Sequence, residues 1–163
     1  MIASAHILSG MVCGAMGRRA WSKTFRMMVA FGAGLVSHVM LDAIPHSDYG
    51  SLQGWRLLAV VILEIAASVV AGWFVLRRRW SPGDRGPLLA GVIGSTFPDA
   101  KFAATILPAP AADWVQSIGD LFHRGFHAAP TALFPGLAAE LVTIVVLLFA
   151  LAFAIRLDPR SIA

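Results

Sequence analysis

Long hydrophobic stretches alternate with short polar connections along the chain. Two of the stretches, Trp55–Leu76 and Thr131–Ile155, are long enough to cross a hydrocarbon layer about 30 Å thick as helices. Three less apolar stretches complete a set of five predicted spans, namely Ile2–Gly17, Met27–Pro45 and Leu88–Leu107. The pattern therefore predicts an all-α protein, a bundle of about five transmembrane helices in which residues 1–163 form a single domain.

The segment from Asp113 to His127 has a different pattern, that of a helix with two unlike faces. Its polar residues recur at steps of three and four, and Trp114, Ile118 and Phe122 follow the same period on the other face. Prolines bracket the segment on both sides. We therefore expect an amphipathic helix that lies in the membrane interface before the last span.

The composition of the chain supports a membrane protein. Hydrophobic residues make up 58% of its 163 residues and charged residues 13%, and the mean hydropathy is +0.74. These values are typical of membrane proteins rather than of soluble single domains. Cys13 is the single cysteine of the sequence, which excludes an intrachain disulfide and a zinc site built from cysteines.

Lysine and arginine residues lie mostly on one side of the predicted spans. Of the 13 basic residues, only Arg56, Lys101 and Arg124 fall on the other side. Under the positive-inside rule this distribution places the N-terminus outside and the C-terminus in the cytoplasm. It also accounts for the net charge of +4 and the pI near 10.2, so no nucleic-acid partner is needed to explain them.

The second predicted span ends in a cluster of ionisable residues. His38 and Asp42 are four residues apart, which places both side chains on one face of a helix, one turn apart. Pro45 then ends the helix, and His46 and Asp48 follow it. An aspartate at this depth costs about 2.5–3.5 kcal/mol on insertion scales, so these residues are candidates for a functional site. An interhelical hydrogen bond that involves His38 and Asp42 is the alternative.

Every predicted span carries at least one ionisable residue in its outer half. At a rise of ~1.5 Å per residue, His6 lies about 6 Å from the outer end of the first span. On the same rise, Glu64, Asp99 and Glu140 lie roughly 12 to 14 Å below the outer ends of the last three spans. Because isolated charges in lipid are costly, we expect these side chains to turn inward around one polar cavity that opens to the outside.

The amphipathic segment supplies a second pair of possible metal ligands. His123 and His127 are also four residues apart, with Asp120 one turn earlier as a ligand or an orienting carboxylate; a solvated helix face is the alternative. We expect this pair to meet His38 and Asp42 and to bind a divalent metal, preferably zinc, because three imidazoles and a carboxylate suit zinc. The side chains expected as further ligands, or as groups that orient the ligands, are His6, His46, Asp48 and Asp99.

Four motifs, taken in order along the chain, resemble a known family. The motifs are His6 with Gly10, Ser37–Tyr49, Gly94–Asp99 and Phe122–His127. They are similar to those of small bacterial inner-membrane proteins related to the membrane-bound metal-dependent hydrolases. The resemblance implies a multi-pass protein of the bacterial inner membrane. The chain departs from the hydrolase motifs at Lys101, where an aspartate is usual, and at Ala128, where a serine is usual.

A hydrolase is the first function that these residues favour. A divalent metal polarises a phosphoryl or acyl oxygen and lowers the pKa of a bound water to about 7. Such an enzyme would act at the outer leaflet on a membrane lipid or on a lipid-linked phosphate or ester, with Glu64 or Asp99 as the catalytic base. Arg124 or Lys101 would hold the anionic group of the substrate.

The alternative is a non-catalytic subunit of a larger membrane complex. In that role His38 or another histidine binds a pigment or a haem, or packs between helices, and other membrane-protein subunits are the partners. A transporter fits less well, because the carboxylates lie on one side of the membrane rather than along a path across it. Bound zinc would favour the hydrolase, whereas a visible chromophore or co-purifying subunits would favour the complex.

Overall fold

The structure is a computed structural model that describes residues 3–16, 22–44, 55–76, 85–99, 108–123 and 133–156. Within these ranges every long element is a helix and no strand occurs, so the all-α prediction is confirmed for them. The helices are α1 (Ala3–Met16), α2 (Lys23–Asp42), α3 (Trp55–Leu76), α4 (Arg85–Thr96), α5 (Ala109–His123) and α6 (Leu133–Arg156).

Several predicted helices agree closely with the structure. The bounds of α3 are those predicted, and α1 and α6 differ from theirs by only one or two residues at each end. The start of α2 lies four residues before the predicted one, at Lys23. The reason is a local cap, since the Ser22 hydroxyl accepts a hydrogen bond from the Phe25 N–H at 3.2 Å.

Two helices differ more from their predicted ranges. The span predicted at Leu88–Leu107 is an α-helix only as far as Thr96, followed by a 3-10 turn over residues 97–99. Pro98 explains the change, because a proline disfavours the α conformation of the residue before it. Residues 100–107 lie outside the described part of the chain. The helix predicted at Asp113–His127 begins four residues earlier, where the Pro108 carbonyl accepts hydrogen bonds from two N–H groups of the first turn, each at 2.9 Å.

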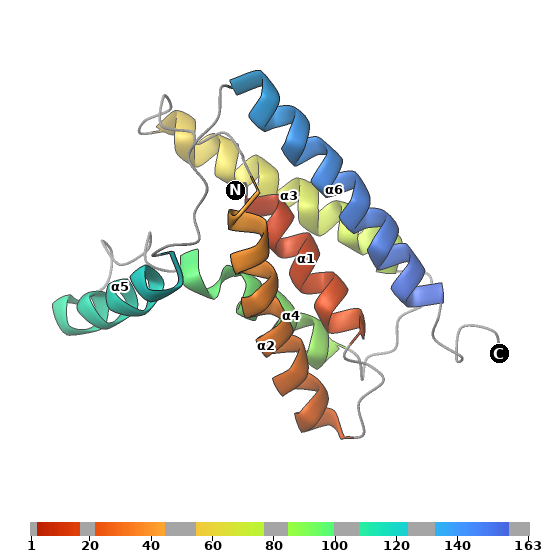
Figure 1. Cartoon of the computed structure of the whole chain (residues 1–163), viewed down its shortest axis with the longest axis horizontal. Coiled ribbons are helices and arrows are strands. Elements are labelled where there is room, and N and C mark those ends of the chain that lie inside the picture. Colours follow the sequence, from red (N-terminus) through yellow and green to blue (C-terminus); the bar gives the residue numbers. More distant parts are fainter. Residues whose placement is uncertain are drawn as a thin grey trace.

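Three helices form the centre of the fold. α1, α2 and α4 pack against one another, α6 and α3 pack against α1, and α5 extends to one side with only slight contact to α2 (Figure 1). The direction of the chain alternates: α1, α3 and α6 run one way, whereas α2 and α4 run the other way (Figure 1). Alternating direction is the arrangement expected of consecutive helices joined by short connections.

Glycines let the three central helices approach closely. A Cβ atom added at Gly91 of α4 would lie 2.9 Å from the Gly14 nitrogen of α1, and would also collide with the Gly10 carbonyl. On the other side of α4, a Cβ added at Gly34 of α2 would lie 2.8 Å from the Ser95 nitrogen. Small residues at such crossings let helix backbones come into contact. The crossings bring the first turns of α1 to the level of the last turns of α2 and α4.

Large apolar side chains cover much of the outer surface. Met28 is 67% exposed, Leu63 68% and Phe149 73%. In the part of the chain that the structure describes, two helices are long and apolar enough to cross a membrane, Lys23–Asp42 and Ala138–Arg156. Two apolar helical stretches are shorter, Ser4–Met16 and Ile62–Phe74. Exposed apolar surface along such helices favours association with a membrane.

Candidate metal centre

Two histidines and an aspartate from two helices meet in the interior. His6 comes from the first turn of α1, and His38 and Asp42 come from the last two turns of α2. Both imidazoles are fully buried and Asp42 is 2% exposed. His38 Nε2 lies 3.1 Å from Asp42 Oδ2, and His6 Nε2 lies 3.3 Å from Asp42 Oδ1. The carboxylate therefore faces one imidazole with each of its oxygens.

The two imidazoles are stacked on each other, and a second carboxylate lies beside them. The ring centroids of His6 and His38 are 4.2 Å apart, with an angle of 24° between the ring planes. Asp99, in the 3-10 turn after α4, places its Oδ2 atom 3.9 Å from His6 Nε2 and 4.0 Å from His38 Nδ1. Its side chain is 30% exposed, so Asp99 is the member of the group that solvent reaches.

Ser95 of α4 joins the helices around this group. Its backbone carbonyl lies 2.8 Å from His38 Nδ1, and its hydroxyl donates a hydrogen bond of 2.6 Å to the His6 carbonyl. The hydroxyl of Ser9 donates to the same carbonyl at 2.9 Å, and Ser37 donates to Ser9 at 3.2 Å. These bonds fix α1, α2 and α4 at the level of the imidazoles. Ser95 is not among the predicted site residues, because its contact with His38 uses a backbone atom.

The contact with Ser95 determines which nitrogen of His38 carries a proton. A carbonyl oxygen only accepts hydrogen bonds, so Nδ1 must be the protonated nitrogen. In the neutral ring the lone pair is then on Nε2, which faces the Asp42 carboxylate. Two acceptors face each other across 3.1 Å unless a cation lies between them, either a second proton on the ring or a metal ion.

The geometry of the group could accommodate a metal ion. One ligand atom from each of His6, His38 and Asp42 can be chosen so that all three lie within 4.8 Å of one another, so the group could hold a metal ion. Neither ring nitrogen of His6 makes a well-aligned hydrogen bond to the described residues. Ligands held about 2.0–2.1 Å from a tetrahedral zinc ion are about 3.3 Å apart. The nitrogen–oxygen distances here are 3.3 and 3.1 Å, each to a different oxygen of Asp42. A ligating histidine also typically donates its other N–H to a carbonyl, as His38 does to Ser95.

Two other carboxylates predicted to face the polar cavity lie on α3 and α6. Glu64 is half-buried on α3, where its backbone carbonyl accepts a hydrogen bond from Ser68, and Glu140 is 1% exposed on α6. α3 and α6 both pack against α1, and neither carboxylate belongs to the group formed by His6, His38 and Asp42.

Most of the outer residues predicted for the site lie outside the described structure. His123 is the last residue of α5, and its side chain is not among those described. The remaining predicted site residues lie outside the described ranges, namely His46, Asp48, Lys101, Arg124 and His127. The structure therefore brings together His38, Asp42, His6 and Asp99.

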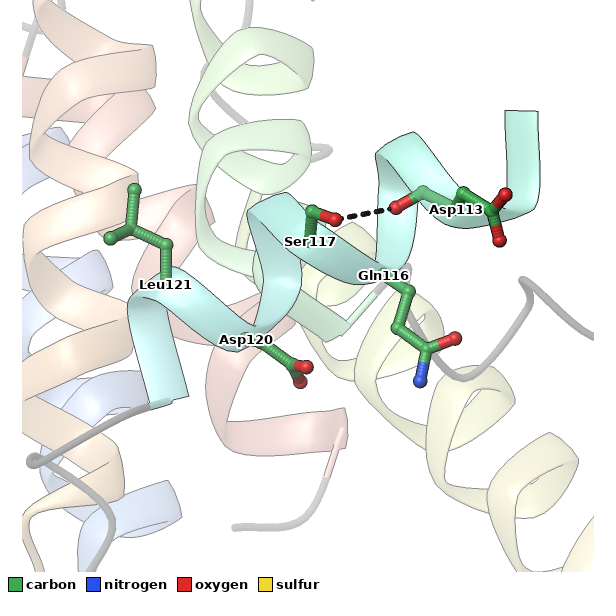
Figure 2. Close-up of a pocket in the computed structure, with 5 residues that line it drawn as sticks. All are labelled: Asp113, Gln116, Ser117, Asp120 and Leu121. Atoms are coloured by element: carbon green, nitrogen blue, oxygen red, sulfur yellow. Dashed lines mark hydrogen bonds between the residues drawn. The ribbon is translucent and has the colours of Figure 1, made fainter. Parts of the chain in front are cut away.

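A hollow of about 550 Å³ lies on the polar side of α5 and is separate from this group. Figure 2 shows its lining, with Asp120 and Gln116 on one side of the helix and Leu121 on the other. The Ser117 hydroxyl donates a hydrogen bond of 2.8 Å to the Asp113 carbonyl within the helix. The hollow shares no residue with the histidine group, and its carboxylates belong to one exposed helix.

Comparison of the chain with models of protein families, with curated proteins and with solved structures finds no match in any of the three. The function is therefore argued from the site.

Proposed function

We propose that this protein is a membrane-embedded, metal-dependent hydrolase whose divalent ion is held by His6, His38 and Asp42. The observation that carries the proposal is the pair of buried imidazoles directed at one carboxylate, with the Nδ1 proton of His38 committed to the Ser95 carbonyl. A cation between these groups removes the unfavourable meeting of acceptors. A second proton on His38 would relieve the same contact, and neutral His6 can donate its own Nε2–H to Asp42, whereas a metal ion would join both imidazoles and the carboxylate directly.

Zinc is the proposed metal. Two imidazoles and a carboxylate are the protein ligands of many catalytic zinc sites, which keep a further position for water or substrate. The same ligand set also suits ferrous iron, so the metal content of the purified protein decides between the two. When bound, the ion would polarise a substrate oxygen and make its bound water acidic enough to react near neutral pH.

Asp99 is the proposed catalytic base. Its carboxylate is the partly exposed member of the group and lies within 4.0 Å of a nitrogen of each imidazole. It is therefore placed where water and substrate would approach the otherwise buried ligands. Glu64, on α3, lies outside the group and is the weaker candidate.

The proposed substrate is a membrane lipid, or a lipid-linked phosphate or ester, in the outer leaflet. The five predicted spans, with the N-terminus outside and the C-terminus in the cytoplasm of a bacterium, would place the histidine group near the outer surface. The alternating directions of α1, α2, α3, α4 and α6 support this topology (Figure 1). Lys101 and Arg124 remain the proposed partners of the anionic group of the substrate.

A subunit that binds a pigment or haem is less well supported. His6 and His38 have no exposed surface, and their rings stack on each other at 4.2 Å. A haem iron needs open space beside its histidine ligand for the macrocycle. The stacked pair offers no such space, so metal binding by the imidazoles and Asp42 is the better account of their arrangement.

The direct experiment is to measure the metal content of detergent-purified protein by mass spectrometry, before and after treatment with a chelator. We expect stoichiometric zinc in the wild type and its loss in His6→Ala and His38→Ala. Asp113→Asn, on exposed α5, is the matched control and should keep the metal. Wild-type protein that contains no divalent metal, and takes none up when zinc or iron is added, would refute the proposal.

Catalysis is tested separately with Asp99→Asn. This variant should retain the metal but lose hydrolysis of phospholipid and lipid-linked phosphate substrates in mixed micelles. If a metal-loaded wild-type protein hydrolyses none of a panel of such lipids, the hydrolase part of the proposal is wrong and the metal has a structural role.

A further inference from the structure

An apolar groove lies between α2 and α4, apart from the histidine group. It has a volume of about 590 Å³. Its walls are the exposed faces of the two helices, and Met28, Leu89 and Ile93 on them are 67%, 59% and 46% exposed. The lining residues are Thr24, Met27, Met28, Phe31, Gly86, Leu89, Ala90 and Ile93.

Two cations stand at one end of this groove. Lys23 precedes Met27 by one helical turn on α2, and Arg85 precedes Leu89 by one turn on α4, so each base is on the groove face of its helix. Both basic residues are exposed. The two ends are also close to each other, since a Cβ atom added at Gly86 would lie 3.5 Å from Lys23 Cε.

The charges of these two helices are segregated by end. The acidic residues, Asp42 at the end of α2 and Asp99 after α4, lie at the opposite end from Lys23 and Arg85. The groove therefore has a positive end and an apolar wall that runs away from it. Its lining extends over about 10 Å, from Thr24 to Phe31 at ~1.5 Å per residue.

We propose that this groove binds an anionic phospholipid of the cytoplasmic leaflet. The phosphate lies between Lys23 and Arg85, and an acyl chain lies along Met27, Leu89 and Ile93. This inference rests on the membrane location and orientation in the proposed function, but not on the metal. Basic residues at the membrane surface attract anionic lipids, and apolar walls favour the acyl chain over water.

A lipid explains the groove better than a second copy of the chain does. A symmetric dimer in a membrane has its two-fold axis along the membrane normal, so both copies present the same end to the same side. Pairing through the groove would then gather two copies of Lys23 and two of Arg85 at one level. Like charges at such a contact repel, whereas a lipid phosphate neutralises them.

The experiment is to measure retention of phosphatidylglycerol and phosphatidylcholine with identical oleoyl chains, by native mass spectrometry of the protein in detergent. The double variant Lys23→Gln, Arg85→Gln should lose its preference for phosphatidylglycerol, on the order of tenfold or more. Arg156→Gln is the matched control, because Arg156 is an exposed cation at the end of α6 and away from the groove. An unchanged preference in the double variant would overturn the inference.

A second variant tests the acyl-chain part. Leu89→Trp should fill the groove and reduce retention of both lipids, whereas Val146→Trp, on the exposed face of α6, should not. If Leu89→Trp instead abolishes a dimer and leaves lipid retention unchanged, the groove is a contact between copies and the inference is wrong. Equal retention of both lipids by all these proteins would also contradict it.

The metal content of the same samples separates this inference from the proposed function. The groove variants should keep the metal, and His38→Ala should lose the metal while it keeps the preference for phosphatidylglycerol. Loss of lipid preference with intact metal content therefore tests the lipid site in the groove and leaves the metal site unaffected. Wild-type protein that is absent from the membrane fraction would refute the membrane location and this inference together.

Discussion

Asp42 is the residue on which the metal interpretation depends most. Its two oxygens lie 3.3 Å from His6 Nε2 and 3.1 Å from His38 Nε2. Without Asp42, Asp99 would be the remaining carboxylate that the described residues are seen to place beside the stacked imidazoles, with its nearest oxygen 3.9 Å from His6 Nε2. The charge of Asp42, rather than its shape, is therefore what a metal ion would need.

The variant Asp42→Asn tests whether the negative charge of Asp42 is needed for metal binding, because it replaces one carboxylate oxygen with an amide nitrogen. The amide keeps the volume of the side chain and can donate a hydrogen bond to one Nε2 atom, so the fold should survive. The metal loses its anionic ligand, so we expect zinc affinity to fall by at least about 100-fold, more than for loss of an outer hydrogen-bond partner. Competition with a chromophoric chelator measures the change. Asp113→Asn, at an exposed position of α5, is the control, and wild-type affinity in Asp42→Asn would contradict a role for the carboxylate as a ligand.

The residues of the site differ in how well their role can be predicted from the sequence. His38 and Asp42 are visible because a spacing of four places them on one helix face, and the structure has them 3.1 Å apart. His6 is visible only as a polar residue in an apolar helix, and nothing in its neighbourhood tells which helix it meets. The contact of Ser95 with His38 cannot be predicted from the sequence, because every residue type has a backbone carbonyl that could accept this hydrogen bond.

At the scale of helices, the site depends on how closely α1 and α4 cross. The Gly10 and Gly14 backbone of α1 lies directly against Gly91 of α4. This contact sets the height of His6 relative to Ser95 and His38. Glycines within apolar helices are typical of close helix contacts in general, but only the fold shows that these glycines determine the position of a ligand.

Gly91→Ala is therefore expected to disturb the site from a distance. The added Cβ would collide with the α1 backbone, which cannot move aside as a flexible side chain can, so we expect a cost of ~1–3 kcal/mol and a weaker zinc affinity. Gly32→Ala is a matched control, because a Cβ at Gly32 of α2 would meet nothing within 4 Å. That substitution should be neutral or should stabilise the helix by up to about 1 kcal/mol. Thermal unfolding in detergent and zinc titration measure both effects, and equal behaviour of the two variants would contradict this account.

Helix ends were predicted less well than helix centres, for local reasons. The hydrophobic pattern indicates which residues face lipid or protein. The pattern changes little over the last turn of a helix, so it does not locate the helix end. The start of α2 is determined by the Ser22 cap, and the end of α4 by Pro98. The serine and the proline are both present in the sequence, but each acts on single backbone groups. The predicted helix ends follow the runs of apolar residues instead.

At the scale of the whole molecule, the proposed topology makes a prediction about sidedness. Ser51 and Ser81 lie in the second and third connections of the chain, outside the described residues. In a Cys13→Ala background, Ser51→Cys should react with a membrane-impermeant maleimide added from outside, and Ser81→Cys should react only after the membrane is opened. The reverse pattern would overturn the proposed orientation, and with it the placing of the histidine group near the outer leaflet.

A metal at this site would also hold the molecule together, because its ligands come from α1 and α2 and are fixed by hydrogen bonds to α4. An ion that binds the folded protein alone stabilises it by about 2.7 kcal/mol at a free concentration 100 times its Kd. A chelator should therefore lower the thermal unfolding temperature of the wild type in detergent, and added zinc should restore it. The same chelator should have a much smaller effect on Asp42→Asn, in which zinc affinity is weaker by at least about 100-fold. If the wild type unfolds at the same temperature with and without chelator while its metal is removed, the ion contributes nothing to the packing of these helices. In that case the hydrogen bonds of Ser95 and the glycine crossings alone would have to hold two buried imidazoles against a carboxylate, at the energetic cost that makes such groups rare in apolar interiors.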